Sequence, residues 1–168
     1  GSELLAKCFA YPDDGALDAM REVAATGGHL LAEGPLHALL ESLATTRQVT
    51  LERDYATVFT LTTSPDCPTF ETAYVCRDPA QQTSRMADIN GFYRSWGVDA
   101  SGTSFRPDDI SVELEFMAFL CRKQAFAAAN MGAPRAGQTA RAQRMFLSNR
   151  LGRWALAVAA GMQRTAAP

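Results

Sequence analysis

The chain has 168 residues, of which 47% are hydrophobic and 20% are charged, and its formal net charge is −2 with a pI of about 5.7. These values are typical of one soluble globular domain and exclude a disordered chain. They also argue against nucleic acid as a partner, because phosphate binding requires a basic surface. No apolar run of about eighteen residues is present, so we expect no stable insertion into a membrane.

The N-terminus begins with Gly1 and Ser2 in place of an initiator Met, which is typical of an expression scar, so we expect a single domain over 3–168. No secretion signal is visible, which favours the cytoplasm as the compartment. Reduced thiols fit that compartment, since no two cysteines form a Cys-x-x-Cys pair. The cysteines are Cys8, Cys67, Cys76 and Cys121.

Apolar residues at helical spacing predict a succession of helices along the first third of the chain. Two short helices are expected, one within 4–11 and one that starts near Leu17 and ends at 27–28, a Gly-Gly pair. Pro35 is a suitable first residue for a third helix, and Thr50 is a suitable N-cap for a fourth. No alternating run or hairpin dipeptide predicts a strand, and the expected fold is therefore all-α.

The middle of the chain contains a loop, a well-marked helix and a connector. The segment 62–69 has two prolines and cannot be helical. Asp78 followed by Pro79 predicts the cap and first residue of the next helix, and Gly97 predicts its end. The Gly- and Ser-rich stretch 98–106 then suits a hinge between two groups of helices.

The stretch 105–120 organises the rest of the bundle. Pro107 is tolerated only in a first helical turn, and the aspartates after it can accept bonds from free amide groups, so a central helix is expected from about 108 to 130. Leu114, Phe116 and Met117 are its expected core residues. A further break is expected over 131–137. A last long helix should then start at Gln138, with its arginines on a solvated face near acidic neighbours.

The chain lacks the residues that several classes of chemistry require. The chain has no phosphate-binding glycine loop, no nucleophile elbow and only two histidines, His29 and His37, neither of which has a metal-ligand spacing. We therefore expect no enzyme activity, no metal and no cofactor. Acidic residues instead lie beside aromatic residues and prolines in two segments, 66–74 and 105–115. That combination suits a peptide that carries both positive charge and apolar residues.

The residues expected to bind such a peptide come from these two segments. They are Asp66, Pro68, Phe70, Glu71, Tyr74, Phe105, Pro107, Asp108, Asp109 and Glu113.

Three ordered motifs carry a resemblance to a known family. The first runs from the acidic and tyrosine-containing 52–55 to Cys-Pro-Thr-Phe-Glu-Thr-Ala-Tyr at 67–74. The second is Phe-Tyr-Arg-Ser-Trp-Gly at 92–97, and the third is Arg-Pro-Asp-Asp-Ile at 106–110 with Glu-Leu-Glu-Phe-Met at 113–117. Together they resemble the TorD/DmsD/NarJ-like redox-enzyme maturation chaperones.

The resemblance implies a fold and a function. The fold would be the all-α TorD-type bundle, and the protein would be a cytoplasmic chaperone without catalytic activity. It would bind the twin-arginine signal peptide, or another N-terminal segment, of a molybdenum oxidoreductase catalytic subunit and hold it until the cofactor is inserted. The form of the motif favours clients of the dimethyl-sulfoxide-reductase superfamily. The chaperone would be a monomer or a helix-exchanged dimer.

Two departures and two alternatives accompany this interpretation. Asp109 replaces the histidine that usually follows Pro-Asp in the family, and 149–151 reads Asn-Arg-Leu where the family usually has His-Leu. An all-α ligand-sensing or scaffold domain that binds a partner helix or a small cation is the first alternative. A helical metalloenzyme with iron or zinc is the second.

Overall fold

The computed structural model of the chain describes residues 1–31, 36–59, 64–99 and 106–165, and every regular element in these ranges is helical. The all-α prediction is confirmed. In chain order the elements are α1 (Ser2–Phe9), α2 (Ala16–Leu31), α3 (His37–Thr45), α4 (Gln48–Phe59), α5 (Thr72–Val75), α6 (Pro79–Ser95), α7 (Ile110–Asn130), α8 (Ala133–Phe146), the π-helical η1 (Leu147–Leu151) and α9 (Gly152–Thr165).

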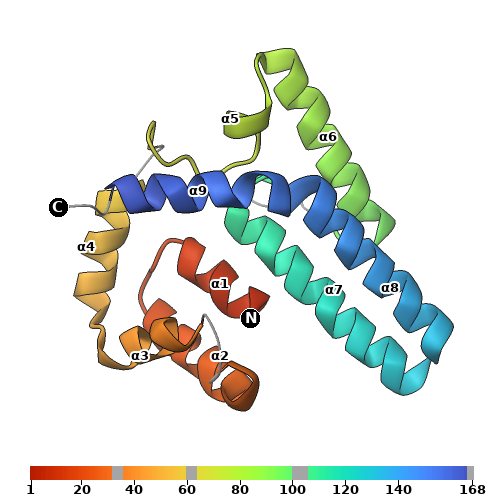
Figure 1. Cartoon of the computed structure of the whole chain (residues 1–168), viewed down its shortest axis with the longest axis horizontal. Helices are drawn as coiled ribbons and strands as arrows, with labels where there is room; N and C mark the ends of the chain where they lie inside the picture. Colours follow the sequence, from red (N-terminus) through yellow and green to blue (C-terminus); the bar gives the residue numbers. More distant parts are fainter. Residues whose placement is uncertain (32–35, 60–63, 100–105, 166–168) are drawn as a thin grey trace.

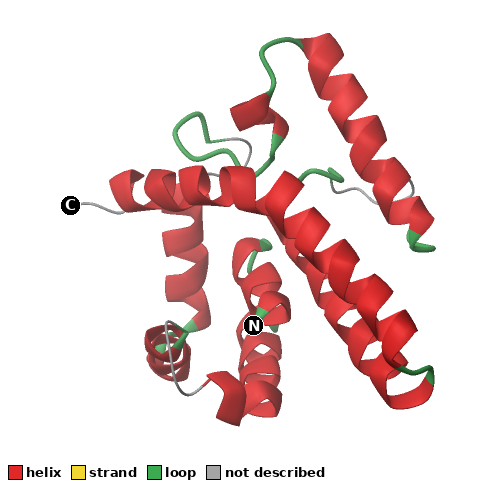
Figure 2. Ribbon diagram, turned by 45° about the vertical axis from the view of Figure 1, so that its right-hand side comes forward, coloured by secondary structure: helices red, strands yellow, loops and turns green. Residues whose placement is uncertain are grey.

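The helices form a bundle around α7 (Figures 1 and 2). α7 and α8 make an antiparallel hairpin, and α1 packs on α7 from the other side. The chain bends at η1, so that α9 leaves the line of α8 and runs across to α4. Single π-helical turns inside α-helices often occur at functional sites. α2 and α3 complete the side of the bundle beyond α1.

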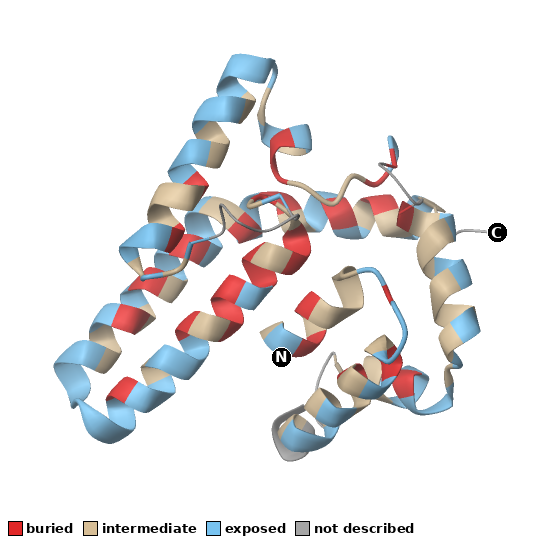
Figure 3. Ribbon diagram, turned by 180° about the vertical axis from the view of Figure 1, so that it is seen from behind, coloured by how far each residue is buried: buried red, intermediate tan, exposed pale blue. Residues whose placement is uncertain are grey.

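α7 is the most buried helix because apolar residues occupy more than one of its faces. Leu114, Phe116 and Met117 are buried as predicted, and buried positions recur along the first half of the helix (Figure 3). The helix begins at Ile110, where the Asp109 side chain caps it by accepting a bond from the Ser111 amide at 2.9 Å. Its C-terminal end at Asn130 agrees with the prediction.

Aromatic rings join three helices in the main core. The Phe116 ring on α7 lies with its centroid 4.5 Å from that of Tyr93 on α6 and 5.1 Å from that of Phe146 on α8. Trp154 on α9 is fully buried in the same cluster. A second, smaller cluster of leucines and Met20 joins α1, α2 and α3. Burial of these large side chains is the main stabilising term of the bundle.

Local sequence signals predicted some helix boundaries correctly and others incorrectly. α6 starts at Pro79 with Asp78 as its cap, and Gly97 follows its end with a φ of 79°, as predicted. The Gly-Gly pair at 27–28 does not end α2, and Thr50 lies inside α4 instead of capping it. α8 begins at Ala133, five residues before the predicted Gln138. Pro35 lies outside the described residues.

The charges are distributed unevenly along the fold. No aspartate or glutamate follows Glu115 in the sequence, whereas α8 and α9 carry several arginines. Arg141 and Arg144 are exposed on α8, as predicted for a solvated face, and no ion pair joins them to a described carboxylate. Arg150 is partly buried instead of solvated, and burial lowers its pKa. Within the described ranges, no helix is both long enough and apolar enough to cross a membrane.

Candidate functional site

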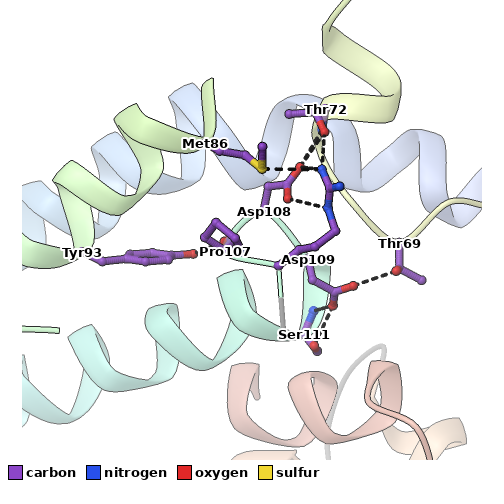
Figure 4. A network of polar contacts seen from close by, with 9 residues as sticks. Thr69, Thr72, Met86, Tyr93, Pro107, Asp108, Asp109 and Ser111 are labelled. Carbon is purple, nitrogen blue, oxygen red and sulfur yellow. Dashed lines mark hydrogen bonds and ion pairs between the residues drawn. The ribbon is translucent and has the colours of Figure 1, made fainter. Parts of the chain in front are cut away.

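Two segments that are far apart in sequence meet at the start of α7. Phe70 and Asp109 form an isolated antiparallel bridge, in which the Glu71 amide donates to the Asp108 carbonyl at 2.8 Å and the Ile110 amide donates to the Thr69 carbonyl at 2.7 Å. We call residues 69–72 and 106–111 together the clasp (Figure 4). It brings together the two acidic and aromatic segments that the sequence singled out.

Asp108 is the centre of the clasp and has no exposed surface. Its Oδ2 accepts from the Thr72 amide at 3.1 Å and from the Thr72 hydroxyl at 2.7 Å. Both carboxylate oxygens also accept from Arg106, Oδ1 from Nε at 3.0 Å and Oδ2 from Nη2 at 3.1 Å. This is the bidentate arrangement in which a guanidinium binds a carboxylate most strongly.

Arg106 makes further contacts around Asp108. Its Cζ lies 4.2 Å from the centroid of the Phe70 ring, at a distance typical of cation–π stacking. Its Nη2 donates to the Thr72 hydroxyl at 2.9 Å and lies 3.7 Å from the Met86 sulfur. The side chain nevertheless stays 43% exposed, whereas the carboxylate beneath it is closed to solvent.

Asp109 faces away from Asp108 and has a different structural role. One of its oxygens caps α7 through the Ser111 amide and also accepts from the Ser111 hydroxyl at 2.6 Å. The other oxygen accepts from the Thr69 hydroxyl at 2.7 Å (Figure 4). Asp109 is only partly buried. It therefore ties the loop before α5 to the start of α7 and still presents charge to solvent.

Glu71 connects the clasp to α6. Its carboxylate is fully buried and is bound by both arms of Arg85, with Nε at 2.9 Å from Oε2 and Nη2 on Oε1. Arg85 also donates to the Asn149 carbonyl at 3.2 Å, at the bend formed by η1. One ion pair thus fixes α5, α6 and η1 relative to one another.

Glu113 lies one turn into α7 and is also fully buried. Its Oε2 accepts from the Trp154 indole N–H at 3.2 Å, while its Oε1 has no partner among the described residues. Burial, together with the nearby Glu71 charge, raises the pKa of Glu113 to about 8, despite the opposing effects of the Trp154 hydrogen bond and Arg150. The carboxyl group is therefore mostly protonated at neutral pH.

The remaining predicted residues in the described ranges are less buried. Asp66 is exposed, and Pro68, Phe70, Tyr74 and Pro107 are partly buried. The Tyr74 hydroxyl donates to the Pro68 carbonyl at 2.8 Å, and burial raises the pKa of Tyr74 to about 12.

Phe105 lies outside the described residues. The Pro107 carbonyl accepts from the Tyr93 hydroxyl at 2.8 Å (Figure 4), so the turn before α7 is fixed to α6.

The structure corrects part of the sequence interpretation. Glu71, Asp108 and Glu113 were expected to be open to a ligand, but all three are fully buried, and the first two are already paired with arginines of this chain. Their basic partners, Arg85 and Arg106, were missed. The close spacing of Arg106 and Asp108 was a usable signal, whereas nothing local in the sequence links Glu71 to Arg85.

A cavity near the clasp was also missed. It has a volume of about 450 Å³ and lies between α1, α7 and the end of α6. Val112 and Phe119 of α7 and Val98 form apolar parts of its wall, and Glu115 contributes a carboxylate. Among the described residues, no group of three or more His, Cys, Asp or Glu side chains is arranged to hold a metal ion.

Comparisons with known proteins identify similar sequences and a similar fold. A family model described as nitrate reductase delta subunit matches residues 30–160. The perchlorate reductase assembly chaperone protein of Dechloromonas aromatica (strain RCB) is 43% identical over 79 residues, which are 44% of this chain and 34% of that protein. The chain thus matches about a third of the length of this curated relative.

A solved structure supports the fold. A crystal structure described as that of a redox enzyme maturation protein from Archaeoglobus fulgidus superposes with a TM-score of 0.55 and 22% sequence identity, covering 88% of this chain and 91% of that one. At this identity the likeness concerns the fold alone. The family match covers well over half of the chain, in the region that contains all three motifs and the clasp. The chain therefore belongs to the nitrate reductase delta subunit family, among the TorD/DmsD/NarJ-like proteins that its motifs resemble.

Proposed function

We propose that the chain is an assembly chaperone for the catalytic subunit of a molybdenum oxidoreductase. It binds the twin-arginine leader or another N-terminal segment of that subunit in the cytoplasm, and it keeps the subunit from export until the cofactor is inserted. It catalyses no reaction itself. Family membership and the likeness to a perchlorate reductase assembly chaperone support this proposal. A client from the dimethyl-sulfoxide-reductase superfamily fits the motif.

The observation that carries the proposal is the surface around the clasp. Asp66 and Asp109 provide carboxylates that reach solvent, and Phe70, Tyr74 and Pro107, from the same two segments of sequence, provide partly exposed apolar surface. A leader with arginines followed by an apolar segment is complementary to such a surface in both charge and polarity. The backbone bridge and the buried ion pairs hold this surface rigid, which reduces the entropy lost on binding.

The buried acids have a supporting role in this proposal. Glu71, Asp108 and Glu113 position the clasp, and Pro68 positions Tyr74 through its carbonyl group. Direct contacts to the client are assigned to Asp66, Asp109 and the partly exposed aromatic residues. Phe105 belongs to the same segment of sequence and is proposed as a further apolar contact.

The proposal is tested by calorimetric titration of a synthetic peptide in which two consecutive arginines precede an apolar segment. Asp66→Asn and Asp109→Asn should each weaken binding about tenfold, since one charge-assisted hydrogen bond contributes about 1.5 kcal/mol. Asp14→Asn, which removes an exposed charge from the turn before α2, is the matched control and should leave the affinity unchanged. Equal affinity of all four proteins would exclude this surface as the site.

The scaffold alternative makes a different prediction in the same experiment. The cavity beside α1 offers apolar surface that could hold a partner helix. A partner helix held there would bind independently of arginines. A second peptide, with both arginines replaced by glutamine, separates the two functions, because only the chaperone function requires the arginines.

A further inference from the structure

The groups around Asp108 form a guanidinium site that is filled by a residue of the same chain. We propose that Arg106 acts as an internal competitor, and that an arginine of the client takes its place on Asp108, Thr72 and Phe70 when the client binds. This inference rests on the proposed function and names one chemical group of the client, the guanidinium, together with the residue that it must displace.

The geometry selects a guanidinium over other cations. Asp108 offers both carboxylate oxygens to a planar fork, at 3.0 and 3.1 Å, the Thr72 hydroxyl accepts a third bond at 2.9 Å, and the Phe70 ring covers one face of the group at 4.2 Å. A lysine ammonium could reach one carboxylate oxygen but could not satisfy the fork and stack its plane on the ring. The site is therefore specific for arginine.

The occupant is less firmly held than the site. Asp108 and Thr72 have no exposed surface, and two backbone bonds of the clasp fix their positions. The Arg106 side chain is 43% exposed, compared with 24% for Arg85, which also holds the Asn149 carbonyl. The Arg106 side chain can therefore swing out while the carboxylate beneath it stays in place.

Exchange of one arginine for another avoids the main cost of opening the site. A buried carboxylate that loses its partner is strongly destabilising. An incoming guanidinium restores the same hydrogen bonds and the same stacking, so that cost does not persist in the complex. Binding then depends on how often Arg106 vacates the site, because the apparent affinity is the intrinsic affinity multiplied by the vacant fraction.

The first experiment tests the site without any client. Arg106→Ala should lower the midpoint of thermal unfolding, and methylguanidinium at millimolar concentration should restore part of the loss, whereas methylammonium should not. Arg53→Ala is the matched control, since Arg53 is 72% exposed and its pair with Asp54 is solvated. No difference between the two cations in Arg106→Ala would overturn the guanidinium site.

The second experiment tests displacement by titrating the arginine peptide into the wild type, Arg106→Lys and Arg106→Ala. If Arg106 occupies the site about nine-tenths of the time, its removal should raise the affinity about tenfold, with Arg106→Lys between the two. A peptide with lysines in place of the arginines should show no gain. Equal or weaker binding of the arginine peptide to Arg106→Ala would show that Arg106 is only structural and would overturn the inference.

The two experiments distinguish failure of this inference from failure of the proposed function. Failure of the peptide to bind any of the proteins would overturn the proposed leader binding, and displacement with it, while the methylguanidinium result still decides whether the site exists. If Arg106→Ala does not fold, Arg106→Lys carries the test. Its affinity for the arginine peptide should then exceed that of the wild type, and an unchanged affinity would count against displacement.

Discussion

Trp154 on α9 donates its indole N–H to the Glu113 carboxyl group on α7 over 3.2 Å, and both side chains are fully buried. The contact joins the helix that leaves the bend at η1 to the helix at the centre of the bundle. It also places an ionisable group where its charge is poorly solvated. The ionisable or polar groups that act on Glu113 from the surrounding elements are Glu71, Tyr93, Asp108, Arg150 and Trp154, with Arg85 behind Glu71.

Glu113 should make the stability of the fold depend on pH. The pKa of Glu113 is about 8 in the folded chain, compared with 4.5 as the ordinary value. Between these values the folded state holds a proton that the unfolded state has lost, so the contribution of Glu113 to stability falls as pH rises, by at most about 1.4 kcal/mol per pH unit. Above the folded pKa this dependence ends.

Glu113→Gln measures the pH-dependent contribution of Glu113 to stability, because glutamine keeps the acceptor for Trp154 and does not titrate. The free energy of unfolding, measured with denaturant at several pH values from 5 to 8, should fall less steeply with pH for Glu113→Gln than for the wild type. Other titrating groups cancel in the difference between the two proteins. Parallel curves would mean that Glu113 is ionised in the folded state throughout this range.

Asp109 should contribute to stability as the cap of α7. Asp109→Ala removes the acceptor for the Ser111 amide and for the Thr69 hydroxyl, and we expect a loss of about 1–2 kcal/mol in the free energy of unfolding. Asp109→Asn keeps a side-chain oxygen at the cap and should lose less than half of that amount. Equal losses for the two variants in denaturant unfolding would contradict the capping role.

The pair of Glu71 and Arg85 should be more important than an exposed pair of the same type. Arg85→Met leaves a fully buried carboxylate without its partner, and we expect a loss of about 3–5 kcal/mol in the free energy of unfolding. Adding Glu71→Gln to Arg85→Met should recover part of this loss. Arg53→Met, which breaks an exposed pair, is the control and should change stability by less than about 0.5 kcal/mol.

Two helical glycines should respond oppositely to alanine. A Cβ at Gly161 on α9 would lie 3.1 Å from both the Asp66 carbonyl oxygen and the Cys67 sulfur, so Gly161→Ala should lose about 1 kcal/mol by forcing the loop outward. A Cβ at Gly91 on α6 would meet nothing within 4 Å, so Gly91→Ala should gain about 0.5–1 kcal/mol from helix propensity. A gain at both positions would show that the loop yields without cost.

Sequence patterns predicted the features whose causes are local. The start of α6 follows from Asp78 and Pro79, and its end follows from Gly97, because each acts on its own backbone. Thr50 was the better cap by residue type, but α4 starts earlier. The Gln48 side chain there donates to the Pro12 and Asp13 carbonyl groups, which lie more than thirty residues away. Such contacts cannot be seen in the neighbouring sequence.

In the candidate site, too, features with local causes were predicted, and features that depend on distant contacts were not. The motifs predicted which residues would gather, and the clasp brings together Phe70, Asp108 and their neighbours. They did not show which acids would be exposed, since that depends on partners brought in by the fold. Asp108 and Asp109 are adjacent in sequence and both carboxylates, yet one is closed off by Arg106 and the other remains partly open at the cap.

The clasp also bears on how two copies of the chain could associate. Residues 69–72 precede the connector 98–106 and residues 107–111 follow it, so the bonds between these two parts join regions that a hinge there would separate. If two molecules exchanged helices across that connector, the bonds between the two segments would re-form between chains, whereas the bonds within 106–111 would stay within one chain. The monomer and the exchanged dimer would then contain identical clasps. The balance between them would then depend on protein concentration and on the conformation of the connector.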